Sequence, residues 1–202
     1  MSVRKLMVSV LAVFATSAML LAGAIAPAQA ARKTPMPKPA TLKLTGKWKK
    51  VSPGSCRSLG FTKCSKSAWV KKNYTMDMLT VASRMSSSSA GKKAFTSGVK
   101  SFKAQHMGTV KTSKSGPNRL AKVSVKIDGV RIRAVVAQRG ARITMITVGS
   151  VKTLPSWAKM TAAAKKVVNP RSGSLPRGKV VNTLMLGSPE SGAIGWAVKP
   201  LT

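Results

Sequence analysis

Three alternating segments between residues 119 and 149 form the clearest hydrophobic pattern in the chain. β-Branched and small apolar residues alternate there with Lys, Arg, Ser and Thr, and the pairs Asp128-Gly129 and Arg139-Gly140 separate the segments. Alternation with a period of two is typical of strands that bury one face, and Asp-Gly is a preferred pair for a two-residue hairpin loop. Arg-Gly is weaker in that position, but the alternation on both sides of it supports a second hairpin. The pattern therefore predicts a three-stranded antiparallel β-meander.

The two turns also predict which side chains share a face of the meander. If both pairs are two-residue loops, Lys126 lies opposite Arg131 across the first turn, and Val136 lies opposite Ile143 across the second. One face is then apolar and should lie on a core; its members are Val123, Val125, Ile132, Ala134, Val136, Ile143 and Met145. The other face is strongly cationic; its members are Lys122, Lys126, Arg131, Arg133 and Arg142, with Val135 and Ile146 among them.

Two amphipathic helices are expected, one on each side of the meander in the sequence. The serines at 86–89 are good N-cap residues for a helix over about 89–106, and Pro155-Ser156 begins a second helix that continues to about Val168. Each has one apolar stripe at helical spacing: Phe95, Val99, Phe102 and His106 in the first, and Trp157, Met160, Ala164 and Val167 in the second. Because such a stripe packs on a sheet, we expect the first helix to cover the apolar face of the meander.

The remaining segments complete a single domain of the α+β class, in which an antiparallel meander sheet is packed by two amphipathic helices as an α/β sandwich. Residues 76–85 alternate and are expected to form a further strand, whereas the basic residues 108–118 are expected to form a loop. The Pro-rich residues 31–41 read as a disordered basic tether. The domain then spans residues 42–169, and residues 170–202 form a linker that could end in a hairpin.

The N-terminus has the three parts of a secretory signal peptide. Arg4 and Lys5 precede an apolar run over residues 6–26, and Ala28-Gln29-Ala30 has small residues where signal peptidase requires them. We therefore expect cleavage before Ala31 and a secreted, extracellular protein, associated in one reading with the cell wall. The alternative is an uncleaved anchor, since the apolar run is long enough to span a bilayer. After cleavage we expect no stable transmembrane segment.

The charge of the chain indicates the kind of partner that it attracts, and its cysteines indicate the compartment. The chain has 36 Lys and Arg residues against 3 Asp and Glu residues, a net charge of +33, so it attracts any polyanion. Its two cysteines, Cys56 and Cys64, are expected to form a disulfide in the oxidising compartment to which the leader directs the chain.

The inventory of reactive side chains argues against catalysis. The three carboxylates are Asp77, Asp128 and Glu190, and the single histidine, His106, ends a helix stripe. A paired-carboxylate or Ser-His-Asp site would need several of these to converge, and Ser-x-x-Lys pairs occur only as often as the composition predicts. We therefore expect no enzyme activity, no cofactor and no metal site.

The order of extended segment, helix, meander and helix over residues 69–168 resembles two groups of secreted α/β-sandwich domains. These are the PsbP-like proteins of photosystems and the extracellular sensor domains of some actinobacterial serine/threonine kinases. The turns Asp128-Gly129 and Arg139-Gly140, together with the cysteine loop, belong to the resemblance. It implies a non-catalytic binding or sensing module.

Three functional hypotheses fit this sequence. In the first, the cationic sheet face with Lys122, Lys126, Arg131, Arg133 and Arg142 binds an anionic cell-wall polymer, a polysaccharide or lipid headgroups, and nucleic acid only non-specifically. In the second, the chain is an extracytoplasmic sensor or interaction domain for a small ligand or a protein partner. In the third, the charge serves only solubility or wall retention. Binding to a polyanion should weaken steeply with salt, whereas binding in an uncharged pocket should not.

Overall fold

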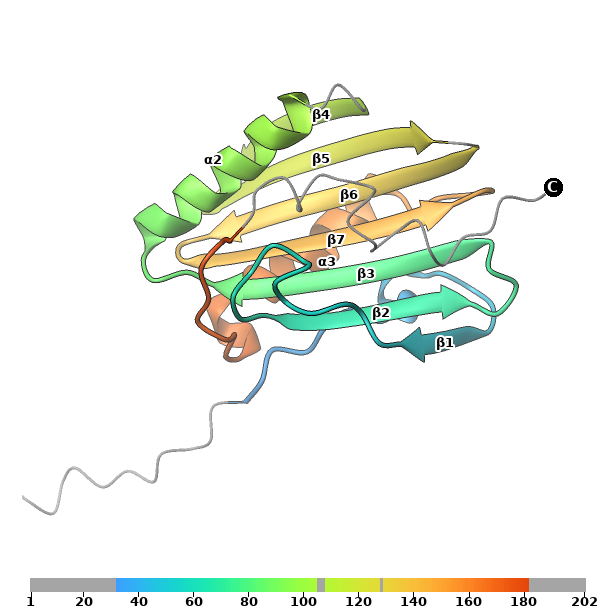
Figure 1. Ribbon diagram of the computed structural model, residues 1–202, viewed down its shortest axis with the longest axis horizontal. Coiled ribbons are helices and arrows are strands. Elements are labelled where there is room, and N and C mark those ends of the chain that lie inside the picture. Colours follow the sequence, from blue (N-terminus) through green and yellow to red (C-terminus); the bar gives the residue numbers. More distant parts are fainter. Residues whose placement is uncertain (1–31, 105–107, 128, 182–202) are drawn as a thin grey trace, which may run out of the picture. The chain divides into compact units, whose positions relative to one another are not determined.

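A seven-stranded antiparallel sheet forms the middle layer of the protein (Figure 1). The computed structural model describes residues 32–104, 108–127 and 129–181. The strands are β1 (Trp48–Val51), β2 (Ser65–Lys71), β3 (Met76–Arg84), β4 (Gly108–Ser115), β5 (Asn118–Ile127), β6 (Val130–Arg139) and β7 (Arg142–Ser150). They lie in the order β1-β2-β3-β7-β6-β5-β4. The predicted meander is β5-β6-β7, and the strand expected within residues 76–85 is β3.

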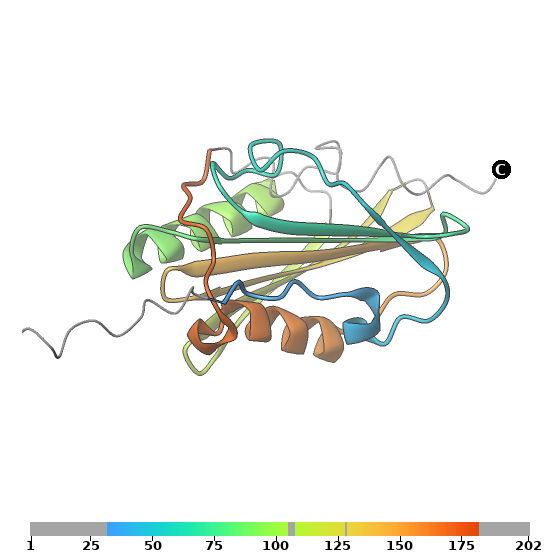
Figure 2. The ribbon, with the colours of Figure 1, turned by 90° about the horizontal axis from the view of Figure 1, so that it is seen from below.

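One helix covers each face of the sheet, as Figure 2 shows. The helix α2 (Ser88–Ala104) lies on one face and α3 (Trp157–Val168) on the other, with the short 3-10 helices η1 (Pro39–Leu42) and η2 (Pro170–Ser172) beside α3. Ser156 caps α3, because its side chain accepts a hydrogen bond from the backbone N–H of Lys159. The predicted class, an α+β sandwich with two helices packed on an antiparallel sheet, is confirmed.

The core beneath α2 contains part of the apolar face that the sequence predicted. Phe95 packs with Val136 and Ile143 in a buried cluster, and Val99 and Phe102 contact the same cluster. Leu59 and Phe61 extend this core from the cysteine loop, where Cys56 and Cys64 form the expected disulfide with their Cα atoms 5.6 Å apart.

The opposite face carries a second core, which corrects the expectation of an open cationic surface. Five apolar residues of the sheet lie buried beneath α3: Leu120, Val135, Ala137, Ile146 and Val148. They pack against Met160 and Ala164 of the helix. Of the cationic residues on this face, Lys126 and Arg131 are exposed beside the first hairpin turn, whereas Arg133 and Arg142 contact residues of α3. Both faces of the sheet are therefore needed for stability.

The first hairpin has the predicted register and the second does not. Lys126 pairs with Arg131 as expected, but Val136 pairs with Met145 rather than with Ile143. The second loop is Gly140-Ala141, with Arg139 paired to Arg142 and with Gly140 at φ +55°. A two-residue loop with glycine first is one of the two favoured hairpin types, and that preference displaces Arg139 from the loop. The shift is by two residues, so each side chain keeps its face.

The segment 108–118, expected to be a loop, contains strand β4 at the edge of the sheet. Most of its side chains are exposed, and lysines recur along it. An edge strand exposed on both sides has no hydrophobic alternation, and lysines are common there because they discourage pairing with other chains.

The segments on either side of the predicted domain are also part of the fold. The backbone N–H of Thr34 donates to the carbonyl of Ser174 at 3.0 Å, and Leu42 is fully buried. The described part of the predicted tether therefore lies along α3 (Figure 2). Single β-bridges from residues 174, 177 and 180 to Lys33, Arg84 and Phe61 hold the described part of the predicted linker. Prolines favour an extended chain, but Pro37 and Pro39 supply apolar surface that packs here.

Several expectations lie outside the described residues: the signal peptide, Ala31, His106, Asp128 and the terminal hairpin. Within the described ranges, none of the helices is long and apolar enough to cross a membrane.

Candidate anion-binding surface

The five predicted contact residues occupy three different environments. Lys126 and Arg131 are exposed and directly opposite each other on β5 and β6, and Arg133 is half-buried on the same face. Lys122 is half-buried between Lys111 on β4 and Val135 on β6. The fifth residue, Arg142, is buried at the other end of the sheet.

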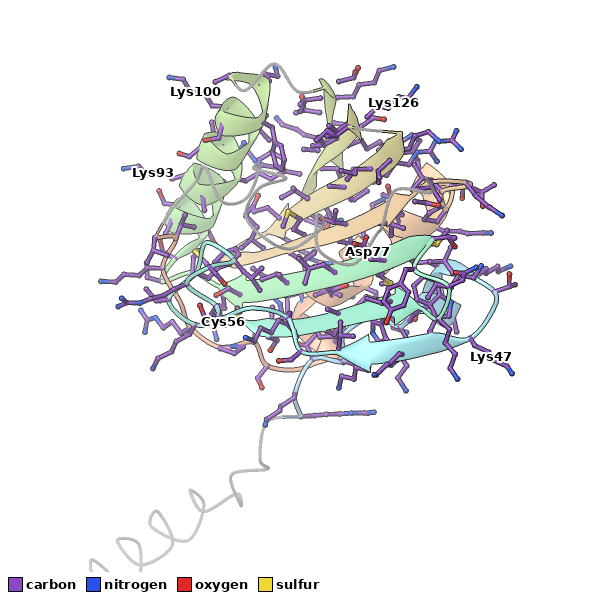
Figure 3. All side chains as sticks on the ribbon, turned by 45° about the vertical axis from the view of Figure 1, so that its right-hand side comes forward. Lys47, Cys56, Asp77, Lys93, Lys100 and Lys126 are labelled. Atoms are coloured by element: carbon purple, nitrogen blue, oxygen red, sulfur yellow. A yellow bond between two sulfur atoms is a disulfide. The ribbon has the colours of Figure 1, made fainter. Side chains whose placement is uncertain are left out.

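Lys126, Arg131 and Arg133 line one open hollow of about 470 Å³, here called the β5–β6 hollow. It lies at the end of the sheet where β7 leads into α3, and Figure 3 shows Lys126 at this end of the sheet. The remaining lining residues are Gly108, Thr109, Ser124, Val125, Thr153 and Leu154. Gly108 lets β4 approach closely, because a Cβ at this position would collide with the backbone of Ser124. The structure thus brings three of the five predicted cations together.

Arg133 is held in place before any ligand arrives. One Nη of its guanidinium donates to the carbonyl of Pro155 at 2.8 Å, and the group lies 4.9 Å from the ring centroid of Trp157. The cation–π contact and the hydrogen bond fix the side chain, while guanidinium has further N–H donors. A side chain that is already ordered loses less conformational entropy when it binds an anion.

Arg142 is a structural anchor rather than a contact residue, which corrects the sequence-based expectation. Its Nη atoms donate to the carbonyl of Gly173 at 2.7 Å, to Oγ1 of Thr34 at 2.7 Å and to the carbonyl of Val167 at 3.2 Å. Burial of the guanidinium, and then the nearby Arg84, lower the pKa of Arg142. The sequence could not reveal this role because the three acceptors come from segments far from β7.

A second cationic hollow lies beside the first and was missed by the sequence reasoning. Lys43, Lys71 and Lys159 line this hollow of about 210 Å³, here called the Lys43 hollow. Its other lining residues are Leu42, Leu44, Thr45, Met76, Thr153, Leu154, Pro155 and Ser156. The three lysines come from the end of η1, from β2 and from α3. No local pattern marks them among the many lysines of the chain.

The two hollows have no acidic neighbour among the residues that the structure describes. The carboxylate in those ranges is Asp77 on β3, which is only 4% exposed (Figure 3). Its Oδ1 accepts a hydrogen bond from the backbone N–H of Gly149 at 3.0 Å, whereas Oδ2 is buried without a partner. Burial raises the pKa of Asp77 to about 7, against the opposing effect of the backbone hydrogen bonds. The six cations of the hollows are therefore not neutralised by any described carboxylate.

The chemistry available at this surface is recognition of negative charge. Within the described ranges, no group of three His, Cys, Asp or Glu side chains lies close enough together to hold a metal ion. The Ser156/Lys159 pair, one of the Ser-x-x-Lys patterns, is explained by the N-cap of α3, because Ser156 Oγ accepts from the backbone N–H of Lys159 at 3.4 Å.

No family model and no curated protein matches this chain. A solved structure with a distant likeness is the extracellular domain of PknH from Mycobacterium tuberculosis. The likeness covers 64% of this chain and 87% of that chain, with 11% sequence identity and a TM-score of 0.43. That domain belongs to a mycobacterial kinase, the second of the two groups that the element order resembles. A likeness this distant carries no information about function.

Proposed function

We propose that this chain is a secreted, non-catalytic binding module that engages an anionic polymer of the cell envelope through the β5–β6 hollow. The observation that carries the proposal is the convergence of Lys126, Arg131 and Arg133 on one concave surface. The disulfide between Cys56 and Cys64 supports an oxidising, extracytoplasmic location.

The pairing of Lys126 with Arg131 favours a binding role over a solubility role. Like charges directly opposite each other on neighbouring strands destabilise a sheet by a few tenths of a kcal/mol. Both side chains are exposed, so an anion can reach them from solvent. An anion bound between the two would remove the repulsion and release counterions of its own.

The proposal is tested by reversing the two exposed cations together. The Lys126→Glu/Arg131→Glu variant should bind long-chain polyphosphate and heparin at least about tenfold more weakly than the wild-type protein at physiological salt. The slope of log affinity against log salt concentration should become shallower by about two, because two contacts are lost. The variant keeps a like-charged pair across the strands, so its stability should change little.

The matched control is Lys92→Glu/Lys100→Glu on α2, which changes the net charge equally on the opposite face of the sheet. Both lysines are exposed, and Lys100 projects from α2 away from the sheet (Figure 3). The control should retain most of the affinity. If both variants lose affinity equally, the attraction is spread over the whole surface and the proposed site is wrong.

One observation favours the second hypothesis, a sensor or interaction domain. An open hollow of about 270 Å³ lies between α2 and the segment 178–180, and its lining is largely apolar, with Met85, Ala94 and Val180. Lys93 and Lys179 lie at the same hollow, so only an uncharged ligand held there would bind with little dependence on salt. A shallow salt slope for a ligand taken from the native cell envelope would therefore favour this alternative.

A further inference from the structure

We infer that the two cationic hollows act together and that the ligand is a flexible linear polymer with closely recurring phosphate groups. This inference rests on the proposed function and adds the Lys43 hollow to the binding surface. A single phosphate would occupy one hollow, whereas a chain could place successive phosphates in both.

The two hollows form one continuous surface. Thr153 and Leu154, in the segment between β7 and α3, line both of them. Each hollow has three cations, so the pair presents Lys126, Arg131, Arg133, Lys43, Lys71 and Lys159 on either side of this shared wall. A polymer that crosses the wall gains from its second contact through effective concentration rather than through a new independent association.

The backbone conformation at Lys43 indicates that the lysine side chain has a role beyond the fold. Lys43 has φ +56° and ψ +35°, a left-handed conformation that favours glycine, and it follows η1 as the C-cap. The fold alone is better served by glycine, which adopts this conformation without a Cβ clash. Lys43 is exposed and lines the hollow, so its side chain is available to a ligand.

The side chain of Lys71 reaches the same hollow because Gly46 leaves room for it. Gly46 has φ +101°, and a Cβ built on it would lie 2.7 Å from Cε of Lys71. The side chain of Lys71 therefore lies over the bare backbone of Gly46. Two of the three cations of this hollow are thus positioned by local backbone features, the left-handed cap at Lys43 and the bare backbone of Gly46.

The shape of the surface selects among polyanions. Duplex DNA has a persistence length of about 50 nm and cannot bend from one small hollow over a wall into the next. Single-stranded nucleic acid is usually held by stacking on aromatic rings, and neither hollow is lined by one. A membrane is flat on this scale and would meet the rim of the hollows rather than their interiors. A flexible phosphate chain fits best.

The test uses substitutions in the Lys43 hollow that the fold should tolerate. Lys43→Gly relieves the left-handed residue, and Lys159→Glu creates a Ser-x-x-Glu capping box with Ser156 at the start of α3. The Lys43→Gly/Lys159→Glu variant should therefore have an unfolding midpoint at least equal to that of the wild-type protein. Its affinity for long-chain polyphosphate should nevertheless fall at least about tenfold.

Chain length provides the second readout. The wild-type protein should bind long-chain polyphosphate far more tightly than tripolyphosphate at equal phosphate concentration, and the variant should lose most of that difference. Lys92→Glu/Lys100→Gln removes the same three charges from α2 and should preserve the difference. Loss of stability in the variant would contradict the account of Lys43 and Lys159.

The possible failures are distinguishable. If the Lys43 hollow variant binds long chains like its control while Lys126→Glu/Arg131→Glu binds weakly, the inference is wrong and the proposed function stands. If all variants weaken binding equally, both are wrong. If vesicles of anionic phospholipid bind as tightly as the polymer and respond to the same substitutions, the ligand is a lipid surface and the inference is overturned.

Discussion

The Asp77→Asn variant should have a nearly flat dependence of stability on pH, whereas the wild-type protein should lose up to about 4 kcal/mol of unfolding free energy between pH 4 and pH 8. Burial raises the pKa of Asp77 from 3.8 to about 7, so the folded protein holds a proton that the unfolded chain releases. The contribution of protonated Asp77 to the unfolding free energy is therefore fully present below the pKa of the unfolded chain. It is lost as the pH rises through the pKa of the folded protein. At pH 8 the ionised Asp77 carboxylate is buried, with Oδ2 unpaired.

The net gain from the substitution at pH 8 should be smaller, about 2 kcal/mol, because the new amide N–H group also lacks a partner. Urea unfolding from pH 4 to pH 8.5 measures both curves, with the disulfide kept intact. The chain has one histidine and three carboxylates, so few other groups titrate in this range. His106→Gln serves as the background control. A wild-type protein whose stability rises between pH 5 and pH 8 would contradict a buried, protonated Asp77.

The Arg142→Met variant should lose about 3 kcal/mol of unfolding free energy. Its guanidinium donates three hydrogen bonds, to Gly173, Thr34 and Val167, and their loss leaves those acceptors without this donor. Hydrogen bonds from charged donors contribute about 1.5–3 kcal/mol each. Methionine has no charge to desolvate, so the variant avoids the cost of burying the guanidinium, and this offsets part of the free energy lost with the three hydrogen bonds. Chemical denaturation at neutral pH measures the change.

Arg139→Met is the matched control, since Arg139 is paired with Arg142 across the hairpin and is only half-buried. It should change stability by less than about 0.5 kcal/mol. Hydrogen exchange gives a second readout, because Arg142 holds Thr34 against the segment around Gly173. The N–H of Thr34, which donates to Ser174, should exchange faster in the Arg142 variant than in the control. Equal stability of the two variants would show that Arg142 is not an anchor.

The sequence predicted the parts of the fold that depend on local pattern. Alternation marked β5, β6 and β7, and Asp128-Gly129 marked their first turn, because turn geometry and side-chain period are set by neighbouring residues. The second turn was misplaced because Gly140 fits either position of a two-residue loop. Strand β4 has no apolar face, so its pairing with β5 could not be anticipated.

The candidate site was only half predictable for a related reason. Lys126, Arg131 and Arg133 converge through the hairpin register, which the sequence contains. Lys43, Lys71 and Lys159 converge only when η1, β2 and α3 meet at one end of the sheet. The alternating pattern places Arg142 on the same face of the sheet as Lys126, Arg131 and Arg133. In the folded protein, however, segments near residues 34 and 173 cover Arg142. Alternation assigns a side chain to a face, but it does not show what covers that face.

The central claim is that the anionic partner binds at this end of the sheet rather than over the whole cationic surface. The most direct measurement is a titration of the isotope-labelled protein with long-chain polyphosphate at physiological salt, followed by backbone amide chemical shifts. We predict that the largest shifts occur at Ser124, Arg131 and Thr153 in the β5–β6 hollow, with only small changes at Lys92 and Lys100 on α2. Shifts of equal size on both faces of the sheet would contradict the claim.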